Sequence, residues 1–209
     1  MNRFKIFFAL LLCLACFSTN AQTPQALIDQ MIEKLDKQAI DAKFVVGLQA
    51  DRISDPDIYR GNILMKGSSF HLSMQDLQVF YDGTTQWAYQ ESTNEVSITT
   101  PTSEDLAGIN PLAMIKQFKK RCKIEFFDKE KKEGSYIIVF YPKEEKSDIN
   151  KLLVTISKKD LLPTKLVLEA SQGNVTTLVL SSLELRTNIP SSSFDGTNKF
   201  PQAIINDLR

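Results

Sequence analysis

The 209-residue sequence has few of the side chains that build metal sites and catalytic centres: three cysteines and one histidine. Cys13 and Cys16 lie within the first 21 residues, so Cys122 is alone in the remainder and can form no disulfide there. No Cys/His cluster has metal-ligand spacing, and neither a Gly-x-Ser-x-Gly elbow nor a glycine-rich phosphate loop occurs. His71 stands alone between two apolar residues of an expected strand. We therefore expect no enzyme, no metal and no cofactor.

Charge of either sign is not in excess, with 25 basic and 25 acidic residues. A nucleic-acid-binding protein usually carries a strongly basic field, so this balance argues against that class. A basic run does occur just past the middle of the chain, and we interpret it as a solvated helix end. Docking on an acidic membrane partner or on anionic lipid headgroups is the alternative. The run consists of Lys116, Lys119, Lys120, Arg121 and Lys123.

The N-terminus has the pattern of a secretory signal. Arg3 and Lys5 precede an apolar run over 6–17, which is too short to span a bilayer as a helix, and small polar residues lead to Ala21. Cleavage after Ala21 would leave residues 22–209 as one domain in the periplasm. Lipoprotein processing at Cys16, which would anchor the protein to a membrane, is the alternative.

The alternation of apolar residues predicts a mainly β, α+β domain. An apolar stripe at helical spacing indicates a helix from Pro24 to about Asp41, after which the period changes to two. Two short helices are expected to begin near Thr102 and at Asn110-Pro111, since both places have helix-start signals. The pattern predicts one curved antiparallel sheet of about ten strands with three helices. Its later strands are expected at 122–127, 136–141, 152–157, 164–170 and 175–186.

A predicted hairpin carries the largest aromatic side chains. Asp82-Gly83 lies between two runs rich in aromatic and β-branched residues, which is a strong hairpin signal because glycine tolerates the positive φ of the turn. The second arm sends Trp87 and Tyr89 to one face. A large apolar face without catalytic chemistry points to a protein that holds something apolar.

Four motifs in order resemble the LolA family of periplasmic outer-membrane lipoprotein carriers, over essentially the whole mature chain. The resemblance implies a half-open β-barrel whose concave apolar face is covered by helices, and a chaperone that moves lipoproteins from the inner to the outer membrane. The motifs are Tyr81-Asp82-Gly83-x-x-x-Trp87-x-Tyr89, the segment 110–115, the pair 162–165 and 173–176, and the C-terminal pattern over 189–207.

The resemblance also implies partners. Acylated lipoproteins or lipids would be the ligands of a monomer, and an inner-membrane release complex and an outer-membrane acceptor would be its membrane partners. A lipid- or lipoprotein-binding sensor or acceptor domain of the same fold is the alternative function. In the family an arginine near the end of an early strand hydrogen-bonds the lid; the corresponding segment here, Met65-Lys66-Gly67-Ser68, has no arginine.

The expected acyl-chain cavity combines one face of each strand with one face of a lid helix. Periodicity alone favours an ordinary core packed against the helices, because alternating apolar faces are usually core. Only the family resemblance favours a cavity. The residues expected to line the cavity are Phe44, Val46, Leu48, Tyr59, Ile63, Met65, Phe70, Leu72, Trp87, Tyr89, Leu112, Ile115, Phe126, Phe140, Leu166 and Leu168.

Overall fold

The structure is a computed structural model that describes residues 22–51, 53–130 and 132–209. The expected signal peptide over 1–21, its cleavage after Ala21 and the alternative processing at Cys16 lie outside these residues. None of the helices in the described part of the chain is both long and apolar enough to cross a membrane.

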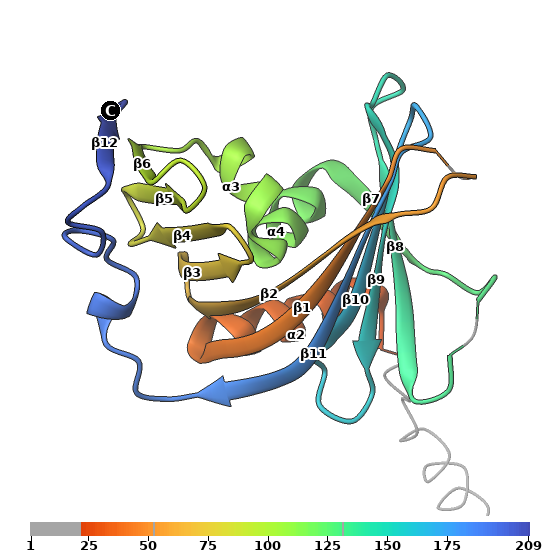
Figure 1. The fold of residues 1–209 in the computed structure, drawn as a ribbon. Helices are drawn as coiled ribbons and strands as arrows, with labels where there is room; N and C mark the ends of the chain where they lie inside the picture. The colour runs from red at the N-terminus through yellow and green to blue at the C-terminus, as the bar shows by residue number, and fades with distance from the viewer. Residues whose placement is uncertain (1–21, 52, 131) are drawn as a thin grey trace, which may run out of the picture.

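A single twelve-stranded sheet dominates the described residues and curves into a half-open barrel (Figure 1). Its strand order is β12-β6-β5-β4-β3-β2-β1-β11-β10-β9-β8-β7, so the two halves of the chain meet where β1 pairs with β11. The strands are β1 Ala39–Gln49, β2 Asp57–Lys66, β3 Ser69–Met74, β4 Leu77–Tyr81, β5 Gln86–Gln90, β6 Glu95–Thr99, β7 Cys122–Phe126, β8 Ser135–Pro142, β9 Ile149–Ser157, β10 Pro163–Ala170, β11 Val175–Arg186 and β12 Ile204–Asp207.

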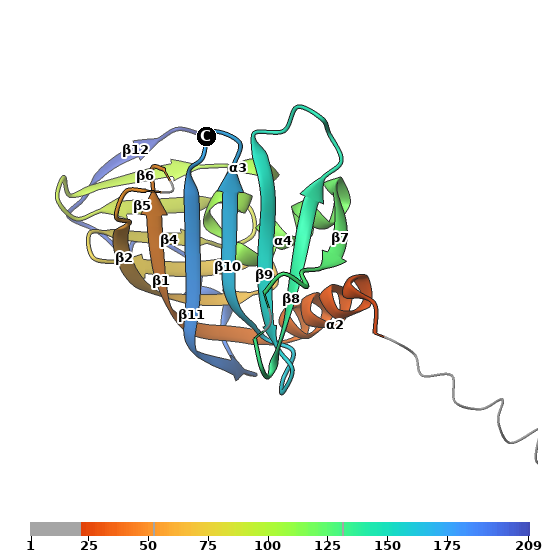
Figure 2. The same cartoon turned by 90° about the vertical axis from the view of Figure 1, so that its right-hand side faces the viewer.

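Three α-helices of the described residues lie on the concave side. Figure 1 shows α3 (Ser103–Ile109) and α4 (Pro111–Arg121) between the arm formed by β3 to β6 and the arm formed by β7 to β10. Helix α2 (Pro24–Lys37) lies across the lower end of the half-barrel, and Figure 2 shows it beside β8. The curved sheet and helix-covered concave face agree with the fold predicted from the sequence.

The first helix is shorter than predicted. It ends at Lys37 rather than near Asp41, because Gln38 takes extended backbone angles and the chain enters β1 at Ala39. Ile40 then pairs with Met65 on one side and Leu185 on the other, so ladder hydrogen bonds and burial in the core outweigh the helical pattern there.

One strand pair departs from the antiparallel prediction. The C-terminal segment runs along the outside of the half-barrel, and its strand β12 pairs in parallel with the edge strand β6 (Figure 1). A four-residue strand that returns from far along the chain has no turn signal beside it, which is why the pattern did not reveal it.

A β-bulge interrupts the central pair of strands β1 and β11. Asp41 pairs with Glu184 and Lys43 with Ser181, so β11 has one more residue than β1 between these positions. Ser182 takes up the extra length with a φ of +50°. The added residue reverses the alternation of β11, and leucines three positions apart can therefore point to the same side.

Substitution of Ser182 tests this bulge. The side chain is exposed, so its replacement changes backbone strain without removing core packing. We expect Ser182→Val to lower the free energy of unfolding by about 1–3 kcal/mol, because a β-branched residue is strained at positive φ. Ser182→Gly should not destabilise the protein. Urea unfolding of both variants checks the prediction, and equal stabilities would contradict it.

Within the described residues, the buried apolar side chains form two clusters on opposite faces of the sheet. The larger cluster lies on the concave face and joins strand residues such as Phe70 and Tyr81 to the helices. The smaller contains Phe80, Trp87 and Val96 on the convex face, where the C-terminal segment covers it. Cross-strand pairing explains the division, since partners share a face.

Trp87 and Tyr89 therefore do not join Phe70 on the concave face, and this corrects the sequence prediction. Phe200 of the C-terminal segment stacks on Tyr89 with ring centroids 3.9 Å apart. Gly196 lies so close to Trp87 that a β-carbon there would be 2.6 Å from the indole. The two aromatics hold the C-terminal segment on the outside of the half-barrel.

His71 belongs to the same convex cluster. Its ring stacks on Phe80 at 4.0 Å, and its buried Nε2 has no hydrogen-bond partner among the described residues. Burial lowers the pKa of His71 below its ordinary value. A hydrogen bond to Gln78 acts in the opposite direction, and the positive charge of Lys199 lowers the pKa further. The neutral imidazole is thus the form that the folded state favours.

A pH dependence of stability follows. Because the folded pKa is depressed, the unfolded chain takes up the proton first, and His71 destabilises the fold as pH falls below about 6.5 towards the folded pKa. Between pH 7.5 and 5, we expect the free energy of unfolding to fall less in His71→Phe than in the parent. Above pH 7, the two curves of free energy of unfolding against pH should be parallel. Denaturant unfolding across this range checks the prediction; parallel curves throughout would contradict it.

Candidate functional site

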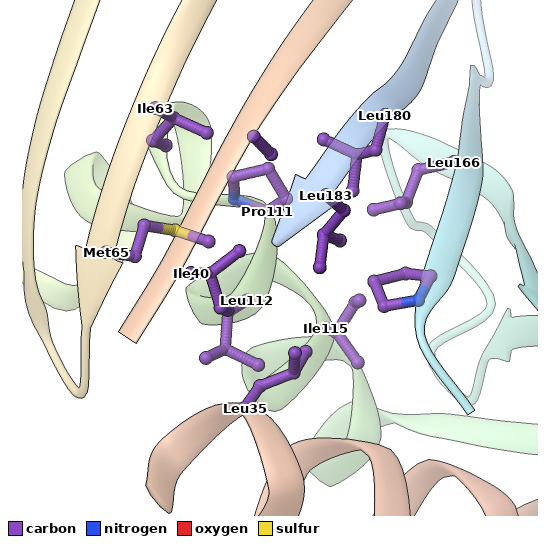
Figure 3. A pocket seen from close by; sticks show the side chains of 12 residues that line it. Leu35, Ile40, Ile63, Met65, Pro111, Leu112, Ile115, Leu166, Leu180 and Leu183 are labelled. Carbon is purple, nitrogen blue, oxygen red and sulfur yellow. The ribbon is translucent and has the colours of Figure 1, made fainter. Parts of the chain in front are cut away.

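An apolar cavity lies between the concave face and two of the helices (Figure 3). Leu35 of α2 and Leu112 of α4 approach it from the helix side, and strands β1, β2, β10 and β11 form the opposite wall. The full lining is Leu35, Ile40, Ala42, Ile63, Met65, Pro111, Leu112, Ile115, Pro163, Leu166, Leu180 and Leu183.

Helix α4 is placed over the cavity by its own start signal, as predicted. The side chain of the buried Asn110 accepts hydrogen bonds from the backbone N–H groups of Leu112, at 2.9 Å, and Ala113, at 3.3 Å. Pro111 occupies the first helical position, where a missing N–H does no harm. This cap directs Leu112 and Ile115 into the concavity, and both are buried.

The cavity is small. Its volume is about 20 Å³, close to the minimum that holds one water molecule and far below the roughly 150 Å³ that accommodates benzene. Its lining has no charged side chain and no polar side-chain group. Such a space suits an alkyl chain by chemistry, but a chain of several methylenes enters only if the helices move away from the sheet.

Five of the predicted residues line this cavity, and most others lie in the same concave cluster. Ile63, Met65, Leu112, Ile115 and Leu166 line the cavity itself. Of the remaining predicted residues, the concave cluster buries Phe44, Phe70, Leu72 and Phe140 and packs Val46 and Leu168 against its side.

Three further predicted residues, Leu48, Tyr59 and Phe126, are exposed. Leu48 and Tyr59 lie on β1 and β2, where Tyr59 pairs with Val46 and so shares the concave face. Phe126 ends β7 and pairs with the buried Ile138. These side chains continue the apolar face beyond its buried part, at the ends of strands.

Seven lining residues were not among the predicted ones. Leu35 belongs to an apolar stripe that the sequence revealed without assigning it to a site. Simple alternation would place Leu180 and Leu183 on opposite faces of the sheet. The bulge at Ser182 adds one residue between them, and both side chains therefore line the cavity. Two leucines three positions apart, separated by two serines, were the available signal. The others are Ile40, Ala42, Pro111 and Pro163.

The lid-contacting arginine of the family has no direct replacement in Lys66. Its ammonium group donates a hydrogen bond to the backbone oxygen of Ile189, at 3.1 Å, in the C-terminal segment. Lys66 therefore ties β2 to that segment and not to a helix.

The reactive side chains of the described residues include a buried cysteine and no metal-binding cluster. Cys122 is a free, buried cysteine, and burial raises the pKa of its thiol, which disfavours the nucleophilic thiolate. Among residues 22–51, 53–130 and 132–209, no three His, Cys, Asp or Glu side chains could together hold a metal ion.

Several solved structures are similar to this one. An uncharacterized conserved protein from Thermus thermophilus is 15% identical with a TM-score of 0.58, and the match covers 89% of this chain and 99% of that one. A LolA superfamily protein from Nitrosomonas europaea is 14% identical (TM-score 0.46; 84% and 98% covered). LprF from Mycobacterium bovis is 8% identical (TM-score 0.45; 80% and 95% covered).

Comparison of sequences gives the family. No curated protein sequence matches the chain. A family model described as outer membrane lipoprotein carrier protein LolA matches residues 16–172, which is more than half of the chain. The chain belongs to the LolA family of outer membrane lipoprotein carrier proteins.

Proposed function

We propose that this protein is a periplasmic carrier that binds the acyl chains of lipoproteins and moves them from the inner to the outer membrane. The observation that carries the proposal is the wholly apolar cavity between the concave sheet and helices α2 and α4. Membership of the carrier family supports it. The proposed partners are acylated lipoproteins, an inner-membrane release complex and an outer-membrane acceptor.

The physics of acyl chains explains why such a vessel is needed. Burial of a methylene group is worth about 0.8 kcal/mol, so one chain of about fifteen methylenes is held in a bilayer by a gross ~12 kcal/mol. Spontaneous transfer across an aqueous compartment is therefore too slow to be useful. A carrier must offer an apolar surface comparable to the bilayer and still release its cargo.

Exchange of one apolar partner for another meets both requirements. In the structure Leu112 and Ile115 of α4 fill the concavity and leave almost no space. An entering acyl chain would displace them and take over their contacts with the sheet. Closure of α4 in the empty protein then competes with the ligand, which limits the affinity and permits release.

The first test is native mass spectrometry of the protein purified from its own periplasm, followed by uptake of a palmitoylated peptide in vitro. Co-purifying triacylated lipoprotein is the expected result. A bound free lipid would move the function towards lipid binding or sensing. An empty protein that also fails to bind the peptide would overturn the proposal.

A matched pair of variants on β11 locates the binding site. Leu183 lines the cavity and is only partly buried, whereas Val179 is exposed on the convex face. We expect Leu183→Gln to weaken binding of the palmitoylated peptide about tenfold, because an amide replaces an apolar contact worth about 1.5 kcal/mol or more. Val179→Gln should bind like the parent; equal losses would place the ligand elsewhere.

A further inference from the structure

Two ion pairs connect helix α4 to helix α2 across the outside of the cavity. The ammonium group of Lys116 lies 2.6 Å from the Asp36 carboxylate, and that of Lys119 contacts the Asp29 carboxylate. Asp29 and Asp36 are seven residues apart, which is two helical turns, so both carboxylates are on one face of α2. Asp36 pairs with the earlier lysine, Lys116, and Asp29 pairs with the later one, Lys119. The two helices are therefore antiparallel along the faces that carry these pairs.

The paired faces lie over the cavity. Leu35, which precedes Asp36, lines the cavity from α2, and Ile115, which precedes Lys116, lines it from α4. Pro111 and Leu112 of α4 also line the cavity. All other lining residues belong to strands of one hydrogen-bonded sheet. Separation of α4 from α2 is thus a way to enlarge the cavity that breaks no sheet ladder.

These contacts also explain the basic run of the sequence. Arg121 pairs with Glu104 of α3, and Lys123 pairs with Glu125 of its own strand. Only Lys120 has no hydrogen bond or ion pair within the described residues. A run whose other members face carboxylates offers little free positive charge to anionic headgroups, so its main electrostatic role is internal.

We propose that the pairs Lys116–Asp36 and Lys119–Asp29 form an electrostatic clamp that holds α4 over the cavity and sets how often it opens. The identity of what enters rests on the proposed function, whereas the clamp is a property of the empty protein. All four side chains are 36–49% exposed. Partly exposed pairs of this kind each change an equilibrium constant by a factor of about 1.5 to 5, which suits a lid that must open.

Hydrogen exchange of the empty full-length protein tests the clamp. In Lys116→Glu/Lys119→Glu, four carboxylates face one another, and we expect the amides of α4 to exchange about tenfold faster or more while those of the buried strand β9 are unchanged. Adding Asp29→Lys/Asp36→Lys reverses both sides and should restore α4 exchange to within about twofold of the parent. At 1 M salt, where screening acts over about 3 Å, α4 exchange of the parent should rise.

Two variants control for charge and for general effects on the helices. Lys120→Glu changes the same charge on the same helix without breaking a pair, and Glu33→Gln breaks the Lys37–Glu33 pair within α2. Both should leave α4 exchange near that of the parent. The clamp is rejected if α4 in the double variant stays within about twofold of the parent, if β9 accelerates equally, or if the fourfold variant fails to recover.

Uptake of the palmitoylated peptide separates this proposal from the carrier function. If the parent does not bind the peptide but α4 responds as expected, the clamp stands and the carrier function fails. If the peptide binds but α4 does not respond, the carrier function stands and the clamp fails. If both hold, the double variant should take up the peptide faster by about the factor by which α4 exchange rises.

Discussion

Gly61→Val is expected to lower the free energy of unfolding by about 3 kcal/mol or more. A β-carbon at Gly61 would lie 2.4 Å from the backbone oxygen of Ser73, 2.5 Å from the Phe44 ring and 2.9 Å from the Met74 side chain. The side chains can shift, but the Ser73 oxygen belongs to the neighbouring strand and moves only if the β2–β3 ladder moves. Overpacking of a well-packed core usually costs about 1–3 kcal/mol, and a backbone obstacle raises the loss.

Gly108→Ala is the matched control. Gly108 lies in α3, and nothing is within 4 Å of the position that its β-carbon would take. Alanine is a better helix former than glycine by about 1 kcal/mol, so this variant should be as stable as the parent or more so. Urea unfolding curves of both variants give the comparison. A Gly61→Val protein as stable as Gly108→Ala would show that the strands around Gly61 adjust freely.

Phe140→Ala is expected to lower the free energy of unfolding by about 3–5 kcal/mol, which is the usual loss when a buried phenylalanine leaves a void. Phe140 has no exposed surface and lies in the middle of the concave cluster, between Ile124 and Leu152 on the adjacent strands. Its contribution is mainly to the stability of the wall on which the proposed ligand would rest.

Phe126→Ala is the control, because it removes the same side chain from the next strand at a position that is 37% exposed. We expect a loss of about 1 kcal/mol or less, as for most surface substitutions. Both phenylalanines were predicted as cavity residues, so the pair also separates structural from ligand-contacting positions. Similar losses of stability would contradict this division, whereas weaker binding of the palmitoylated peptide by Phe126→Ala alone would extend the site to the strand end.

Most elements of the fold could be predicted because their signals are local. Asn110-Pro111 contains both the cap and the first residue of α4, and the turn after Asp82 needs the positive φ that Gly83 adopts, at +112°. Alternation likewise revealed which residues of a strand share a face. Phe44, Val46 and Leu48 were placed together by their period of two, and the structure places all three on the concave side.

The sequence by itself determined most of the elements, their approximate bounds and the alternation of apolar residues along the predicted strands, because these follow from backbone preferences and from a periodicity read over a few residues. Only the tertiary structure decided that Trp87 faces the C-terminal segment, that the bulge at Ser182 turns Leu183 inward, and that Lys116 and Lys119 face α2. Alternation gives two faces without saying which one the helices will cover. That choice is made by contacts between segments far apart in the chain, and no local pattern contains them.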